Sequence, residues 1–256
     1  MQPAREPLCP TCLTPIAREH RFCPACGGER VGAAPPRRRY SELQDPAKAR
    51  LTVLRGGGMD GASFFLNREK QSLGRAGDVR LDDACVAPLH ATFSYVDGKL
   101  VVAPVDAANG VYRRIHGATE VKLGETFLVG ESVFRVVAAE RSERAPAPDG
   151  TVPLASDGGT SSFGVVQLLA GGALGLAYFS RASELTIGQE GNDVNVASDP
   201  FLARSHCSLG SEGSALILMD LDSENGTYVR FTEPREVVHG DYLVVGRCVV
   251  RVEFNA

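Results

Sequence analysis

The sequence predicts an all-β protein in which two copies of one sandwich domain follow a small metal-binding module. Three observations support this. The composition, with 28 glycines, 15 prolines and no tryptophan, is typical of many turns and short strands rather than long helices. Apolar Val250, Val252 and Phe254 alternate with Arg251 and Glu253, which is the period of a half-buried strand. The third observation is an internal repeat.

The repeat matches residues that lie about 116 positions apart. The pairs with this spacing are His90 and His206, Asn109 and Asn225, Gly124 and Gly240, and Gly130 and Gly246. Leu73-Gly74 also matches Ile187-Gly188, and Asp78 matches Asp193, with one or two residues of drift. Self-similarity at this length indicates two copies of a domain, because solenoid repeats have only about 20–50 residues. We therefore expect one sandwich over residues 50–139 and a second over residues 163–256.

Two polar segments are expected to be linkers. Residues 31–49 are rich in proline and arginine, and residues 140–162 are rich in proline, glycine and serine; both compositions favour flexible chain. Residues 1–50 carry nine Lys and Arg against five Asp and Glu, so the rest of the chain carries eighteen (27 − 9) against twenty-six (31 − 5). A basic N-terminal part thus precedes an acidic body. The Arg37–Arg39 cluster could attract phosphate, but a solvated tether is favoured.

An apolar run over residues 163–179 raises the question of a membrane span. It contains no charged residue, but a transmembrane helix needs about 20 residues. The aligned part of the first repeat carries Arg55, Asp60 and Arg68 and cannot cross a bilayer. We therefore predict no membrane span, and a β-hairpin with its turn near Gly171-Gly172.

Four of the seven cysteines form two Cys-Pro-x-Cys knuckles, at Cys9, Cys12, Cys23 and Cys26. Two such turns can close a tetrahedral zinc site with Zn–S distances of about 2.3 Å. Four thiolates leave no open position, so the sequence predicts one structural Zn²⁺, which also supplies the folding energy of so short a segment. An iron–sulfur site and a redox dithiol pair are the alternatives. The predicted zinc ribbon spans residues 1–30.

The remaining cysteines and the N-terminus bear on the compartment. Cys85, Cys207 and Cys248 are scattered and odd in number, unlike a secreted disulfide framework. The first ten residues contain no apolar stretch typical of a secretory signal. We expect a cytoplasmic protein.

Ordered motifs in both repeats resemble a forkhead-associated (FHA) domain. In the first repeat they are Leu73-Gly74-Arg75, Val86–Ala91, Asn109-Gly110, Gly124-Glu125 and Val129-Gly130. In the second they are Leu185–Gly188, Asn192-Asp193, Arg204–His206, Asp220–Val229 and Gly240–Gly246. The resemblance covers roughly residues 50–139 and 164–254. It implies two FHA-type β-sandwiches that bind phosphothreonine peptides through loops at one end. The N-terminal segment is similar to short zinc ribbons of bacterial multidomain proteins, which implies protein contacts or, in some, nucleic-acid binding.

The resemblance also implies roles for individual residues. It assigns phosphopeptide binding to Arg75, Asn109, Arg204 and Asn225, and bracing of the binding loop to His90 and His206. The guanidinium of arginine suits a phosphate because its planar fork donates several hydrogen bonds.

Two departures from the family pattern weaken the expected site. The serine that donates to phosphate in the family is replaced by Ala87 and Ala203, and the second repeat has Gln189 where the first has Arg75. Because each charge-assisted hydrogen bond contributes about 1.5–3 kcal/mol, we expect the first sandwich to be the better phosphothreonine reader.

These inferences predict a non-enzymatic adaptor that binds proteins, including phosphothreonine-containing ones, in bacterial Ser/Thr kinase signalling. A phosphate-independent scaffold and a zinc-ribbon nucleic-acid-binding regulator are the alternatives, although the net charge of −4 gives no bulk attraction for nucleic acid. An enzyme is not expected, because His206 and Cys207 would point to opposite faces of a strand. The glycine-rich residues 56–61 match a nucleotide-binding pattern, but a strand-like segment follows where that fold needs a helix.

Overall fold

The computed structural model describes residues 48–105, 108–139, 146–152, 154, 163–180 and 182–254. The chain forms two compact units, Met1–Leu43 and Gln44–Ala256, and the described residues belong to the second. The predicted zinc ribbon, with Cys9, Cys12, Cys23 and Cys26, lies outside the described residues, as does most of the basic linker at 31–49.

The described residues form twenty strands and one short 3-10 helix, η1 (Ala170–Gly172). The strands of the first repeat are β1 (Arg50–Arg55), β2 (Ser63–Phe65), β3 (Lys70–Gly74), β4 (Val79–Arg80), β5 (Ala91–Val96), β6 (Lys99–Pro104), β7 (Val111–Arg114), β8 (Thr119–Val121), β9 (Thr126–Val129) and β10 (Ser132–Ala138). Those of the second are β11 (Phe163–Leu168), β12 (Leu174–Phe179), β13 (Glu184–Gly188), β14 (Val194–Asn195), β15 (Cys207–Glu212), β16 (Ala215–Asp220), β17 (Thr227–Phe231), β18 (Arg235–Glu236), β19 (Tyr242–Val245) and β20 (Cys248–Glu253). The all-β prediction is confirmed.

The apolar run at residues 163–179 is a hairpin, as predicted. β11 and β12 pair antiparallel, with Val165 opposite Tyr178. The turn between them contains Gly171 and Gly172 with φ of 76° and 81°, a region that favours glycine. Among the described residues, no helix is long and apolar enough to cross a membrane.

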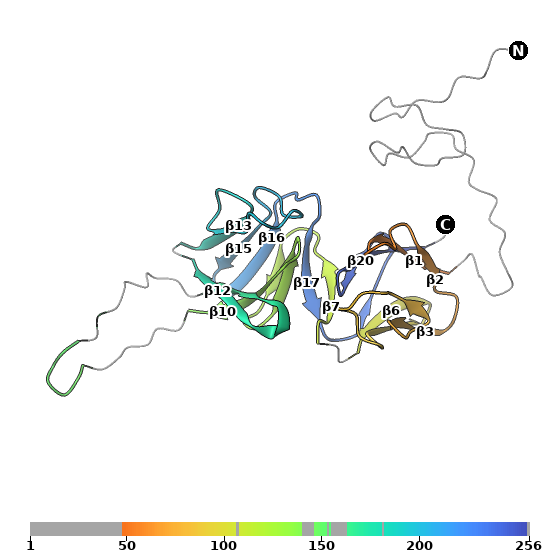
Figure 1. Ribbon diagram of the computed structural model, residues 1–256, viewed down its shortest axis with the longest axis horizontal. Coiled ribbons are helices and arrows are strands. Elements are labelled where there is room, and N and C mark those ends of the chain that lie inside the picture. Colours follow the sequence, from red (N-terminus) through yellow and green to blue (C-terminus); the bar gives the residue numbers. More distant parts are fainter. Residues whose placement is uncertain are drawn as a thin grey trace, which may run out of the picture. The chain divides into compact units, whose positions relative to one another are not determined.

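The strands form one large sheet and two small ones. The ten-stranded sheet has the order β12-β11-β10-β9-β17-β7-β19-β20-β1-β2. The five-stranded sheets have the orders β18-β6-β5-β3-β4 and β14-β13-β15-β16-β8. Each small sheet faces one half of the large sheet, which gives two sandwiches (Figure 1).

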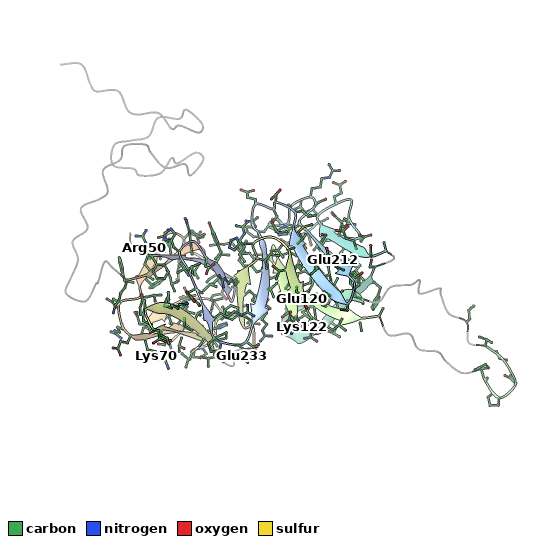
Figure 2. The ribbon with its side chains drawn as sticks, turned by 180° about the vertical axis from the view of Figure 1, so that it is seen from behind. Arg50, Lys70, Glu120, Lys122, Glu212 and Glu233 are labelled. Atoms are coloured by element: carbon green, nitrogen blue, oxygen red, sulfur yellow. The ribbon has the colours of Figure 1, made fainter. Side chains whose placement is uncertain are left out.

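The two repeats exchange their last three strands, which differs from the expectation of consecutive sandwiches over 50–139 and 163–256. β18 of the second repeat pairs with β6 of the first, and β20 pairs with β1. Reciprocally, β8 of the first repeat pairs with β16 of the second, and β10 pairs with β11. Figure 2 shows the result: Glu120 and Lys122 of the first repeat lie in the same sandwich as Glu212, and Glu233, just before β18, lies beside the sandwich that contains Lys70.

The exchange makes one sandwich continuous in sequence and the other discontinuous. The continuous sandwich contains β8 to β17, residues 119–231. It is inserted into the discontinuous sandwich, which consists of β1 to β7 and β18 to β20. The chain passes from one sandwich to the other through residues 115–118 and returns through residues 232–234.

The hydrophobic cores follow the same division. The core of the discontinuous sandwich combines Leu73 and Phe93 of the first repeat with Leu243 and Val250 of the second. The core of the continuous sandwich likewise mixes both repeats, with Phe127 and Phe134 stacked at a ring-centroid distance of 5.7 Å. A third cluster lies where β7 and β17 join the two halves of the large sheet, and contains Tyr112, Leu128, Tyr228, Val244 and Val249.

Candidate functional site

Arg75 lies on the loop that follows β3, at the end of the discontinuous sandwich. Its side chain is exposed, and its Nε donates a 2.6 Å hydrogen bond to the carbonyl of Val86. The backbone N–H of Arg75 also donates to Ala87 O at 3.0 Å. The preceding Gly74 permits this close approach, because a Cβ there would lie 2.2 Å from Pro88 O. Arg75 is therefore fixed against the loop that joins β4 to β5.

His90 and Asn109 hold the same loop from its other side. His90 Nδ1 accepts a 3.0 Å hydrogen bond from the N–H of Ala87, which places the ring proton on Nε2, 2.8 Å from Gly110 O. Asn109 Nδ2 donates to Cys85 O at 2.8 Å. The structure thus brings Arg75 and Asn109 onto adjacent residues of one loop, with His90 buried beneath them.

The second repeat reproduces this arrangement with different side chains. His206 Nδ1 accepts from the N–H of Ala203 at 3.0 Å, and its Nε2 lies 3.0 Å from Gly226 O. Asn225 Nδ2 donates to Phe201 O at 2.9 Å. Gln189 takes the place of Arg75, and its Nε2 donates to the carbonyl of Asp199.

Arg204 is exposed on the β14–β15 loop of the second repeat. Its carbonyl accepts a 2.6 Å hydrogen bond from Asn192 Nδ2. A Cβ at Gly188 would lie 2.1 Å from the same carbonyl oxygen. The backbone of Arg204 is therefore held in place, and its side chain can present a cation at the loop end.

Sequence reasoning missed a polar network on the turn that carries Asn225. Asp220 Oδ1 accepts from Ser223 Oγ and from Thr227 Oγ1, each at 2.7 Å, and Ser223 Oγ lies 3.1 Å from His206 Nε2. The first repeat has apolar Pro104 and Val111 at the positions of the aspartate and the threonine. The signal was present in the Asp220–Thr227 motif, whose side-chain oxygens recur on one short turn.

Burial sets the protonation of the groups at this site. Desolvation lowers the pKa of His90 and of His206 below the ordinary histidine value, so both rings are neutral near pH 7. Burial raises the pKa of Cys248 to about 11 and also raises that of Cys207. Both thiols stay protonated, which makes them poor nucleophiles.

The loop ends are suited to binding an anion beside an extended peptide. Arg75 and Arg204 supply cations, and the amides of Asn109 and Asn225 can donate to and accept from a peptide backbone. Neither loop has the serine hydroxyl of the family pattern, since Ala87 and Ala203 stand there. The described residues contain no group of three or more His, Cys, Asp and Glu side chains that could hold a metal ion.

Comparisons with known proteins give the family of the chain. The family model of the FHA domain matches residues 185–246. The oxoglutarate dehydrogenase inhibitor of Corynebacterium diphtheriae is 34% identical over 104 residues, which cover 39% of this chain and 71% of that protein. Its Corynebacterium efficiens counterpart is 32% identical over 111 residues, covering 42% and 75%.

The chain belongs to the FHA domain family. Similar solved structures include an FHA domain of Chlamydia trachomatis, with 9% identity, a TM-score of 0.33, and coverage of 82% of this chain and 99% of that chain. Another is Mycobacterium tuberculosis EmbR in complex with a low-affinity phosphopeptide, with 19% identity, a TM-score of 0.23, and coverage of 43% and 27%. These TM-scores are low, so the FHA assignment depends on the sequence matches.

Proposed function

We propose that this FHA protein is a non-enzymatic adaptor that binds phosphothreonine-containing proteins in bacterial Ser/Thr kinase signalling. The observation that carries the proposal is the joint attachment of Arg75 and Asn109 to one loop, on the adjacent carbonyls of Val86 and Cys85. One ligand can therefore meet both a guanidinium and an amide. Phosphothreonine supplies the dianion for the first and the peptide backbone for the second.

The first repeat is the primary reader in this proposal. Arg75 presents a fixed cation beside the loop, whereas the amide of Gln189 is neutral and donates to Asp199 O. A dianionic phosphate is attracted more strongly by a guanidinium than by an amide. Arg204 gives the second repeat a weaker site from the neighbouring loop, together with Asn225.

The test is calorimetric titration of the full chain with a phosphothreonine peptide library and with the same peptides unphosphorylated. We expect weak, phosphate-dependent binding that Arg75→Gln and Asn109→Ala reduce at least about tenfold. Lys70→Gln is the matched control, because Lys70 is exposed at the opposite end of β3 (Figure 2). Equal binding of both peptide forms would replace this proposal by the phosphate-independent scaffold. The replacement of the family serine by Ala87 and Ala203 is the sequence feature that favours that scaffold.

The N-terminal residues carry two further proposals. Cys9, Cys12, Cys23 and Cys26 hold one structural Zn²⁺, and the ribbon they close adds a protein-contact module to the adaptor. Strong nucleic-acid binding is not expected, because no aromatic side chains interleave the arginines at residues 37–39. A steep salt dependence of DNA or RNA binding would instead support the nucleic-acid regulator.

A further inference from the structure

An arginine-lined groove of about 610 Å³ lies beside the β7–β17 junction of the large sheet. Four arginines line it: Arg55 and Arg135 of the first repeat, and Arg230 and Arg247 of the second. Glu131 is the only carboxylate in the lining. Four positive charges against one negative charge stand out on a body whose net charge is negative.

The floor of the groove is apolar, and one of the arginines in its wall, Arg230, is held by close packing. Leu128 and Val244 belong to the cluster at the junction, and Leu168 extends the apolar surface towards the β11–β12 turn. Arg230 packs against Gly110, where a Cβ would lie 2.2 Å from the arginine Nε. Tyr112 lies directly opposite Arg230 in the β7–β17 pair. A groove with an apolar floor and arginine walls is suited to a peptide carrying both apolar and anionic side chains.

At one position beside the junction, the first repeat has a small side chain and the second repeat has a phenylalanine. Cys85 lines the groove, and its counterpart in the second repeat is Phe201, as the matching hydrogen bonds from Asn109 and Asn225 show. The guanidinium carbon of Arg55 lies over the Phe201 ring, 4.0 Å from the ring centroid, in a cation–π contact. The small side chain of Cys85 therefore leaves open, on the first-repeat side of the junction, the space that a phenylalanine side chain takes on the other side.

We propose that this groove binds an acidic peptide segment of a partner protein, rich in Asp and Glu and interrupted by apolar residues, without any need for phosphothreonine. Carboxylates are the complementary ligands, because guanidinium groups bind them in bidentate geometry. Arg135 is exposed on β10 and provides one cation. Arg247 provides another, although its Nε already donates to Asp83 at 2.8 Å. The groove also includes Asn109, so one partner could contact both the groove and the β4–β5 loop that Arg75 and Asn109 hold.

The experiment measures fluorescence anisotropy of a labelled peptide of Glu, Asp and Leu, free of threonine and phosphate, on titration with the full chain. We expect Arg135→Gln and Arg55→Gln to weaken binding at least about fivefold each. Glu131→Gln removes the opposing charge and is expected to strengthen binding, which a merely unfolded variant would not do. Cys85→Phe introduces the residue of the second repeat and is expected to abolish binding.

Two controls separate this site from general charge effects. Arg80→Gln and Lys70→Gln remove exposed cations outside the groove and are expected to leave binding of the acidic peptide unchanged. A peptide with Gln and Asn in place of Glu and Asp is expected not to bind. The proposal is overturned if the acidic peptide does not bind, or if Arg135→Gln and Cys85→Phe leave its binding unchanged. It is also overturned if a single-stranded oligonucleotide or inorganic phosphate displaces the peptide at a lower concentration than unlabelled peptide does.

Discussion

Cleavage of the chain between the two repeats gives a direct test of the strand exchange. A protease recognition sequence inserted within residues 146–152 would be cut in the purified full chain, which separates β1–β10 from β11–β20. Consecutive sandwiches would then part into two folded fragments. In the structure, β8–β10 of the first repeat belong to the continuous sandwich, and β18–β20 of the second repeat belong to the discontinuous one. The fragments are therefore expected to remain associated.

The size of the shared cores decides the expected outcome. The first fragment contributes to the continuous sandwich the buried side chains of Val121, Phe127, Val129, Phe134 and Val136. The second contributes to the discontinuous sandwich those of Val237, Leu243, Val245, Val250 and Val252. Burial of a large apolar side chain contributes roughly 1.5–3 kcal/mol, so these ten outweigh the roughly 4–15 kcal/mol that association costs.

The assay is size-exclusion chromatography with light scattering at micromolar protein concentration, before and after cleavage. We expect one peak containing both fragments, with the mass and the far-ultraviolet circular dichroism of the uncut protein. Fragments expressed separately are expected to be poorly folded alone and to recover structure when mixed. Two peaks, each holding one folded fragment, would refute the exchange and restore the consecutive sandwiches over residues 50–139 and 163–256.

Three further predictions concern protonation, packing and metal. Because burial lowers the pKa of His90 and His206, the unfolded chain binds protons that the folded chain does not. The free energy of unfolding should therefore fall as the pH decreases through about 6.5, which urea titrations on both sides of that pH would measure. Gly74→Ala places a Cβ against the Pro88 carbonyl, so we expect a loss of about 1–3 kcal/mol of stability and weaker phosphopeptide binding; the control Gly210→Ala, 3.6 Å from its nearest neighbour, should melt like the wild type. Elemental analysis should find one zinc per chain, lost in Cys23→Ser without a change in the melting of residues 48–254, whereas iron or no metal in the wild type would contradict the zinc ribbon.

The local structure was predictable because it depends on residues close together in sequence. The alternating pattern at Val250–Phe254 became β20, and the apolar run at 163–179 became the β11–β12 hairpin. The repeated aspartates also have equivalent contacts: Asp78 Oδ2 accepts from Ser72 N–H and Oγ, and Asp193 Oδ2 accepts from Thr186 N–H and Oγ1. The repeat spacing therefore located the strands and loops of both copies.

The partners of the last three strands could not be predicted from the same pattern. β9 and β19 carry similar apolar runs, Thr126–Val129 and Tyr242–Val245, and either could pair with β7 or with β17. The alternation that defines a strand fixes which side chains face a core, but not which of two homologous cores receives them. The groove was missed for the same reason, because its arginines come from both repeats.

Contacts between the repeats provide the information that the strand pattern lacks. Arg230 of the second repeat occupies the space beside Gly110 of the first, and Arg114 of the first occupies the space beside Gly226 of the second, each with the absent Cβ only 2.2 Å from the arginine Nε. Both glycines also have positive φ, 65° and 78°, a backbone conformation that favours glycine. Glycine is therefore required at each position both by the backbone conformation and by the adjacent arginine. The Asn109-Gly110 and Asn225-Gly226 pairs thus each accommodate an arginine from the other repeat. Tyr112 and Tyr228 lie opposite these arginines in the β7–β17 pair. The junction that joins the two sandwiches is therefore also where each repeat packs an arginine against the Asn-Gly turn of the other.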